Sequence, residues 1–174
     1  MTPDAQPWSA PVRLSDVQRG ARTLTLVADE PTRGRIAELL DLPSLARLEG
    51  EVTVAPWLDG AEVRARWTAQ LQQLCSVSAE TFDSRLEGEF TVRAVPADSR
   101  AAPAADAEIS VDPDAEDPPD VLEGESLDIG AYLVEHLALE LDPFPRAPGA
   151  EWAPPEEPPE PSPFAKLAAL KRDD

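Results

Sequence analysis

Apolar and polar residues alternate along four segments in the first half of the chain, and this two-residue period is typical of half-buried β-strands. The apolar positions are Leu24, Leu26 and Ala28; Leu48, Gly50, Val52 and Val54; Val63, Ala65, Trp67, Ala69 and Leu71; and Leu86, Gly88, Phe90, Val92 and Ala94. The pair Asp59-Gly60 lies between two of these segments and favours a hairpin turn. The pattern therefore predicts an antiparallel β-meander.

Two other segments have helical spacing. After the first strand, Thr32 can cap a short helix with Ile36, Leu39 and Leu40 on one face, and Pro43 stops it. Further along, Asp128 can cap a longer helix whose apolar stripe is Ile129, Leu133, His136, Leu137 and Leu141. This stripe needs an apolar surface to lie on, so we expect the longer helix to pack across one face of the sheet. The predicted fold class is α+β, with a single domain over residues 8–146.

Proline marks the segments outside this domain core. The chain has 20 prolines, of which five lie in residues 96–119 and nine in residues 143–163. The stretch from about 97 to 120 is also rich in Ala, Asp and Glu, and cannot bury enough apolar area to offset the entropy of ordering. We therefore expect disordered, acidic, proline-rich linkers, one an internal loop at about 97–120 and the other at 147–162.

The negative charge is concentrated in the second half of the chain. Residues 1–95 hold ten Arg and fourteen acids, a balance of −4, whereas residues 96–174 hold five bases and twenty acids, a balance of −15. Such a field attracts basic partners and repels phosphate. It disfavours tight nucleic-acid binding, although the nearly neutral first half could touch RNA locally.

The last residues of the chain contain the strongest candidate for a partner-binding element. Ser162 and Pro163 are a strong helix start, and Phe164, Leu167 and Leu170 then share one face of a predicted C-terminal helix over residues 163–172. A helix this short is marginal in water on its own. We expect it to dock either on its own domain or in a groove of a partner, through Phe164, Leu167, Leu170 and Lys171.

No residue pattern indicates catalysis, a metal or a cofactor. Cys75 and His136 are the only Cys and His, and could in principle pair as nucleophile and base. However, His136 lies on or beside the apolar stripe and Cys75 follows an apolar strand, which favours structural roles for both. Zinc usually needs four ligands, and Cys75-Ser76-Val77-Ser78 offers one thiolate. We expect no catalytic residues, no metal site, no cofactor and no small-molecule substrate.

Three arginines are the candidates for phosphate contact. Arg64 and Arg66 lie two residues apart, so they project from the same, solvent-exposed side of a strand, and Arg93 can join them. The competing interpretation is ordinary charge pairing with glutamates on the neighbouring strands. Direct RNA contact at this spot is therefore expected to be weak.

The compartment follows from what the chain lacks. One cysteine excludes an intramolecular disulfide, which fits a reducing cytosol. The N-terminus has neither the basic start nor the apolar run of a signal peptide. No apolar stretch approaches the roughly 18–20 residues that span a bilayer. We expect a cytoplasmic protein without membrane attachment.

The order of several motifs resembles a known family. They are Gln73-Leu74-Cys75-Ser76-Val77, then Phe82 and Phe90-Thr91-Val92, then Leu127–Leu137 and Leu141–Pro145, and finally Ser162–Lys171. Together they resemble the YceD family, the large ribosomal RNA subunit accumulation proteins of bacteria and plastids, and look closest to its alphaproteobacterial branch. The similarity covers about residues 8–172, and its most specific parts are Asp128-Ile129-Gly130 and Pro163-Phe164-Ala165.

The resemblance implies a non-enzymatic ribosome biogenesis factor that supports synthesis, processing or stability of large-subunit (23S) ribosomal RNA. Many relatives have Cys-x-x-Cys where this chain has Cys75 and Ser78, and some have further cysteines where it has 145–148. The departure implies that this chain does not need thiol or metal chemistry. Its acidic tail suits a basic ribosomal protein or a large-subunit precursor particle as partner. The alternative is an acidic mimic or anti-factor that binds a nucleic-acid-binding enzyme.

Overall fold

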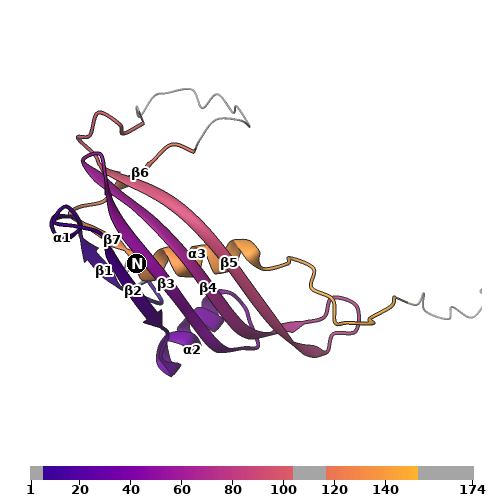
Figure 1. Ribbon diagram of the computed structural model, residues 1–174. Coiled ribbons are helices and arrows are strands. Elements are labelled where there is room, and N and C mark those ends of the chain that lie inside the picture. The colour runs from indigo at the N-terminus through magenta and orange to yellow at the C-terminus, as the bar shows by residue number, and fades with distance from the viewer. Residues whose placement is uncertain (1–5, 104–116, 153–174) are drawn as a thin grey trace, which may run out of the picture.

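A computed structural model describes residues 6–103 and 117–152 (Figure 1). In chain order, its elements are β1 (Pro11–Arg13), α1 (Leu14–Val17), β2 (Arg22–Val27), α2 (Glu30–Leu39), β3 (Ser44–Trp57), β4 (Gly60–Leu74), β5 (Thr81–Pro96), β6 (Asp120–Leu122), β7 (Ser126–Asp128) and α3 (Ile129–Glu140). The expected α+β class, with a mostly antiparallel sheet and few helices, is confirmed. The linker at 147–162 lies partly outside the described residues, and the C-terminal segment 163–172 lies wholly outside them.

The main sheet has the order β2-β3-β4-β5-β6. The first four strands are antiparallel neighbours in chain order, as the alternation predicts. The fifth departs from the expected antiparallel pattern, because β6 pairs in parallel with the end of β5 through Ala94–Pro96. β1 and β7 form a separate two-stranded antiparallel ribbon. The internal loop expected at about 97–120 therefore gives way to a strand at Asp120.

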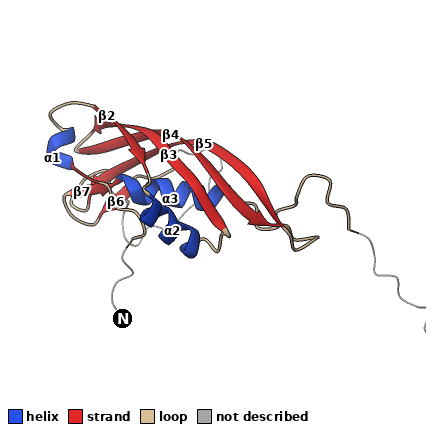
Figure 2. Cartoon of the chain, turned by 90° about the horizontal axis from the view of Figure 1, so that it is seen from below, coloured by secondary structure: helices blue, strands red, loops and turns tan. Residues whose placement is uncertain are grey.

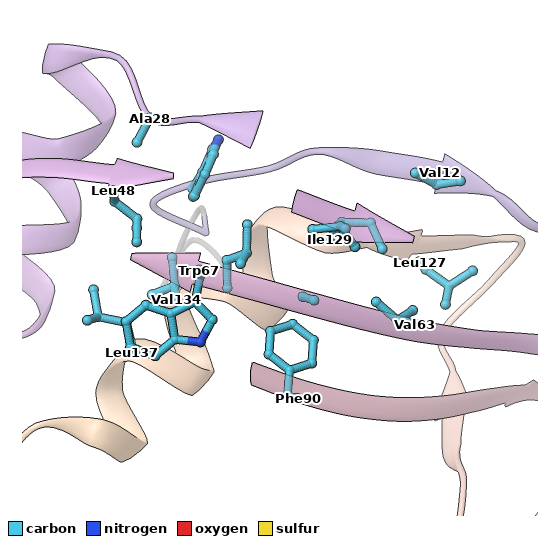
Figure 3. Close-up of a cluster of buried hydrophobic side chains, with 14 of the residues drawn as sticks. Val12, Ala28, Leu48, Val63, Trp67, Phe90, Leu127, Ile129, Val134 and Leu137 are labelled. Carbon is cyan, nitrogen blue, oxygen red and sulfur yellow. The ribbon is translucent and has the colours of Figure 1, made fainter. Parts of the chain in front are cut away.

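Both larger helices lie on one side of the sheet and leave its other face to solvent (Figure 2). The core between them is built from the predicted positions: Val63, Leu133 and Leu137 are each 0% exposed, and Trp67 and Leu71 are each 3% exposed. Figure 3 shows Val63, Trp67 and Leu137 within this core. The expected packing of the longer helix across the sheet is thus confirmed. Burial of these apolar side chains is the main stabilising contribution to such a domain.

Two glycines make room for this packing. A Cβ at Gly50 would lie 2.9 Å from Cδ2 of Leu133, and a Cβ at Gly88 would lie 2.8 Å from Cζ2 of Trp67. Gly50, Trp67 and Gly88 are direct neighbours across β3, β4 and β5. The two glycines therefore flank the indole and let Leu133 of α3 approach the sheet closely.

Aspartates cap both larger helices. The carboxylate of Asp128 accepts hydrogen bonds from the backbone N–H groups of Gly130 and Ala131, which confirms the predicted start of α3. The prediction for the first helix was wrong. Asp29, not Thr32, caps α2, and its carboxylate accepts a hydrogen bond of 2.9 Å from the Thr32 backbone N–H. Of the residues expected on its apolar face, Ile36 is fully buried and Leu40 packs against the core, whereas Leu39 is 57% exposed.

The hairpin turn between β3 and β4 also differs from the expectation. Trp57 pairs with Gly60, so the two turn residues are Leu58 and Asp59, while Gly60 already belongs to β4. Leu58 has a φ of 52°, a left-handed conformation that leucine rarely adopts. The turn residues are thus one position earlier than the Asp59-Gly60 pair suggested.

Candidate interaction surfaces

The open face of the sheet carries all three arginines that the sequence suggests as phosphate contacts. Arg64 and Arg66 alternate with inward residues of β4, and Arg93 is the cross-strand neighbour of Glu62 on the same face. The structure therefore places the three side chains on one surface. Whether they contact RNA depends on how far neighbouring carboxylates already neutralise them.

Each of these three guanidinium groups forms an ion pair with a carboxylate. Glu62 accepts from both Arg64, at 2.5 Å, and Arg93, at 3.1 Å, and the Arg93 guanidinium also lies 5.1 Å from the centre of the Trp57 ring. Arg66 lies 3.4 Å from Glu89. Charge pairing, the competing interpretation of the pattern, thus describes this face. The carboxylate that pairs with Arg64 and Arg93 is Glu62, which was not among the glutamates predicted for this role although it lies on the same strand face as Arg64.

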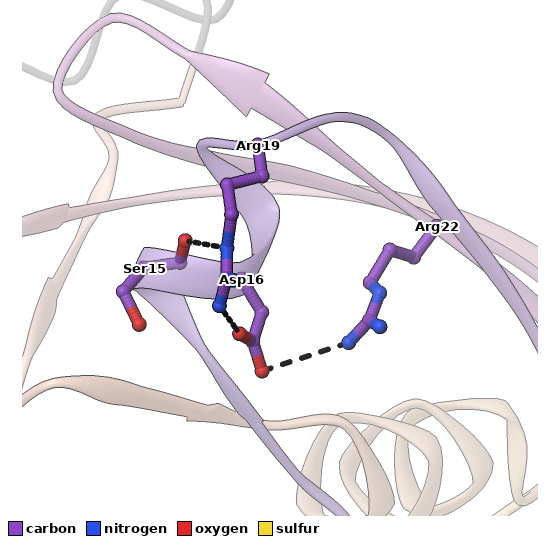
Figure 4. Close-up of polar contacts among 4 residues, drawn as sticks. All are labelled: Ser15, Asp16, Arg19 and Arg22. Carbon is purple, nitrogen blue, oxygen red and sulfur yellow. Dashed lines mark hydrogen bonds and ion pairs between the residues drawn. The ribbon is translucent and has the colours of Figure 1, made fainter.

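Another group of arginines lies at the start of β2. Asp16 of α1 forms ion pairs with Arg19 and, at 3.6 Å, with Arg22, while the Arg19 side chain also donates to the Ser15 carbonyl (Figure 4). The Arg19 and Arg22 side chains are 76% and 53% exposed, so each pair is worth little free energy. This cluster connects α1 to β2 and has one carboxylate for two guanidinium groups.

A shallow acidic hollow lies at the middle of the open face. It has a volume of about 640 Å³ and is lined by four glutamates and one arginine, namely Glu49, Glu51, Glu87, Glu89 and Arg66. The hydrogen bond from Arg47 lowers the pKa of Glu49. This part of the sheet therefore attracts cations more readily than phosphate.

A second cavity, of about 540 Å³, lies where β6 meets β5. Its wall includes Tyr132 and His136 of α3, and the hydroxyl of Tyr132 donates to Asp120 at 3.0 Å. The His136 ring stacks on Phe90, with 3.9 Å between the ring centres. Burial lowers the pKa of His136, and burial together with Asp120 raises the pKa of Tyr132. Both rings are therefore neutral near pH 7, beside the carboxylates of Asp117, Asp120 and Glu135.

Cys75 joins two segments that are far apart in the sequence. Its buried sulfur accepts a hydrogen bond of 3.3 Å from the Ala147 backbone N–H and one of 3.5 Å from the Ser78 N–H. Hydrogen bonds, first from Ser78 and then from Ala147, lower the pKa of the thiol to about 6. Beside it, the backbone N–H and the hydroxyl of Ser76 both donate to the Pro145 carbonyl. We call this set of contacts between 75–78 and 145–147 the tail clamp.

The tail clamp brings together 75–78 and 145–147, the two regions where the family resemblance led us to compare cysteine positions. In this chain, 145–148 contains no cysteine, and the contacts across the clamp are hydrogen bonds. Within 6–103 and 117–152, no three His, Cys, Asp or Glu side chains are arranged to hold a metal ion. In the same ranges, no helix is long and apolar enough to cross a bilayer.

A comparison with protein families adds a finding to this geometry. The model of the family described as "Large ribosomal RNA subunit accumulation protein YceD" matches residues 63–171, which is more than half of the chain. The chain belongs to the YceD family. No curated protein and no solved structure matches it.

The YceD match covers most of the features described above. It runs from β4 through β5, both sides of the tail clamp and α3 to the C-terminal segment. It includes Phe164, Leu167, Leu170 and Lys171, which lie outside the described residues, so their predicted docking stays a prediction. The cavity beside Tyr132 was not predictable from the sequence, because its acidic residues come from separate segments and form no local motif.

Proposed function

We propose that this YceD protein is a non-enzymatic ribosome biogenesis factor. It supports synthesis, processing or stability of 23S ribosomal RNA in the cytoplasm by binding a basic ribosomal protein or a large-subunit precursor particle. The observation that carries the proposal is the family match over residues 63–171. The C-terminal segment with Phe164, Leu167, Leu170 and Lys171 is proposed as one of its partner contacts.

The charges support a basic protein as the direct partner. The chain has a net charge of −19, and the arginines proposed for weak RNA contact, Arg64, Arg66 and Arg93, each lie beside a glutamate. A phosphate would have to displace these carboxylates and approach against the overall field. A cationic protein surface meets neither obstacle, so we assign RNA contact a minor role.

The alternative, an acidic mimic of nucleic acid, receives less support. Such a mimic presents carboxylates as a rigid, uninterrupted array, whereas the open sheet face interleaves them with arginines such as Arg66 and Arg85. Ion pairs of this kind neutralise the array locally.

The test is the ratio of 23S to 16S ribosomal RNA in cells that lack the gene. Deletion should lower this ratio, and the full-length chain should restore it. Phe164→Asp should restore it only partly, because a carboxylate on the proposed docking face opposes apolar burial. The matched control is Phe144→Asp, which places the same charge on an aromatic side chain that is 71% exposed within the described domain. An unchanged ratio after deletion overturns the proposed function, and equal rescue by both variants removes the C-terminal segment from it.

A further inference from the structure

One edge of β5 is unpaired along most of its length in the part of the chain that the structure describes (Figure 1). On one side, β4 pairs with β5 from Thr81 to Ala94. On the other side, β6 pairs with it only from Ala94 to Pro96. An unpaired strand edge presents backbone N–H and C=O groups that another extended chain can use. The stretch Thr81–Thr91 is therefore a place where a further strand can add.

The register identifies which backbone groups face this edge. Trp57 and Gly60 flank a two-residue turn, and such turns close on a hydrogen-bonded pair. Hydrogen bonding alternates sides from one residue to the next in an antiparallel sheet, so Ala61 bonds to its partner Ala94 in β5. The even-numbered residues of β5 thus face β4. The residues whose backbone groups face the open edge are Asp83, Arg85, Glu87, Glu89 and Thr91.

The side chains along this edge are mostly charged on the solvent side of the sheet and include apolar residues on the helix side. On the solvent side, three carboxylates stand against one guanidinium, and the Glu87 and Glu89 side chains are 74% and 76% exposed. On the helix side, Phe82 and Leu86 are half-buried and apolar. An added strand would place alternate side chains on these two surfaces. The edge therefore suits a chain in which basic and apolar residues alternate.

The cavity at the end of β6 continues this surface. It begins at Thr91, the last residue of the open stretch. Its wall includes the carboxylates of Asp117, Asp120 and Glu135, the Tyr132 ring and the Arg93 guanidinium, which pairs with Glu62, so carboxylates outnumber the one guanidinium. Carboxylates and an aromatic ring together are suited to a guanidinium or ammonium group. A chain added to β5 in line with β6 would bring a side chain to this cavity.

We propose that the open edge of β5 binds an extended basic segment of a partner protein by strand addition, with one cationic side chain in the cavity beside Tyr132. The inference rests on the proposed function for the identity of that partner, and adds how the partner is held. A second copy of this chain is a poorer occupant, because both edges would carry the same excess of carboxylates over Arg85 and repel each other.

The binding test uses purified full-length protein and a synthetic probe. The probe is a fluorescein-labelled peptide of twelve residues in which Lys or Arg alternates with Val or Thr. Its control is the same peptide N-methylated at every residue, which keeps the charge but cannot donate a backbone hydrogen bond along either edge. Fluorescence anisotropy should show binding of the probe at least tenfold tighter than binding of the control. Equal affinity for the two peptides would mean charge attraction without strand addition and would overturn the inference.

Protein variants separate the edge from its charge. Glu87→Pro removes a backbone donor that faces the open edge, and proline is tolerated at such edge positions. Glu87→Gln removes only the charge, and Thr25→Pro makes the same backbone change on the outer strand β2. We expect Glu87→Pro to weaken probe binding at least tenfold and Glu87→Gln about twofold to threefold, while Thr25→Pro leaves it unchanged. Hydrogen exchange at Glu87 and Glu89 in the wild-type protein should slow when the probe binds.

These results are distinguishable from failure of the proposed function. If Glu87→Pro folds, as its circular dichroism and melting transition report, and binds the probe as tightly as the wild type, the inference is overturned whatever the cellular result. Should Glu87→Pro unfold, unchanged hydrogen exchange at Glu87 and Glu89 on adding the probe to the wild type overturns it instead. Conversely, a normal 23S to 16S ratio after gene deletion overturns the proposed function while probe binding is measured independently.

Discussion

Because Leu133 packs against Gly50, the effects of substitutions at these two positions on stability should not add. One substitution removes side-chain volume from the contact and the other adds it. Leu133→Ala removes a fully buried side chain and should lower the free energy of unfolding by about 2.7–5 kcal/mol. Gly50→Ala alone puts a methyl group 2.9 Å from Leu133 Cδ2. Such overpacking costs about 1–3 kcal/mol, offset by about 0.5–1 kcal/mol because Ala loses less backbone entropy than Gly on folding.

In the double variant, the new methyl group occupies part of the space that Leu133 leaves. The combined loss should therefore be about 1–2 kcal/mol smaller than the sum of the single losses, within the range measured for residues in contact. Urea unfolding followed by Trp fluorescence measures each value, and the dependence on urea concentration should stay the same across the four proteins. The control is Gly34→Ala at an exposed position of α2, where the Cβ meets nothing within 4 Å and should stabilise by about 0.5–1 kcal/mol. Strict additivity of Gly50→Ala and Leu133→Ala would refute the packing of α3 on this row.

The remaining predictions concern other contacts. Glu62→Ala should lower the free energy of unfolding in urea by about 1–3 kcal/mol, because it removes a buried acceptor of the Arg93 side chain. Arg66→Ala, at an exposed ion pair, should lower it by no more than about 0.5 kcal/mol. Equal losses would contradict the role of burial. Asp128→Ala removes the cap of α3 and should cost about 1–2 kcal/mol, with Asp128→Asn milder. The pKa of Cys75 falls from 9.0 to about 6 on folding, so the unfolded chain binds more protons between these values. Its contribution to stability is thus fully present above pH 9 and lost as the pH falls through 6. The urea midpoint of the wild type should therefore rise between pH 6 and pH 9 more than the urea midpoint of Cys75→Ala. The same dependence of the urea midpoint on pH in both proteins would count against the tail clamp. Truncation after Ala150 should leave the melting transition nearly unchanged and weaken co-sedimentation with large-subunit precursors; a large drop in the melting temperature would make the removed segment part of the folded core.

Long periodic segments were predictable because burial on one face leaves a repeated mark in the sequence. The alternation from Val63 to Leu71 lies inside β4, and the helical stripe after Asp128 is α3 with its expected cap. The strand ends were not predictable, since β4 continues to Leu74 through a run of glutamines whose inward and outward positions do not differ in polarity. β1, β6 and β7 have three residues each, too few for any period to emerge.

The errors have local physical causes. Asp29 and Thr32 are both good capping residues three positions apart, and Asp29 accepts from the Thr32 N–H instead of leaving Thr32 to start the helix. The Asp59-Gly60 pair suggested a turn, yet the ladder pairs Trp57 with Gly60 and puts Leu58 at positive φ. Register between long strands outweighs the preference of a single turn residue.

The candidate surfaces were predictable only where they follow one strand. Arg64 and Arg66 could be placed together because strand geometry puts alternate residues on one face. The tail clamp joins Cys75 to Ala147, which are 72 positions apart. One of its hydrogen bonds comes from a backbone N–H, and since nearly every residue has such a group, the sequence does not indicate this contact. The cavity beside Tyr132 likewise depends on a parallel strand pairing that no turn signal announces.

The tail clamp also determines how far from the domain Phe164 can reach. It holds the chain at Ala147 against the end of the sheet where β5 begins, so the tether to Phe164 starts there and not at the end of α3. A turn closed by the Ala150 N–H and the Ala147 carbonyl follows the clamp, and the fourteen residues from Ala150 to Phe164 span at most roughly 43 Å at the extended rise of about 3.1 Å per residue. Two docking points on one particle can be engaged together only within that distance, and then the second contact forms at a high local concentration. For the proposed function, the tail clamp would limit the distance between the proposed C-terminal contact and the proposed contact at β5, and lengthening the proline-rich stretch should relax that limit.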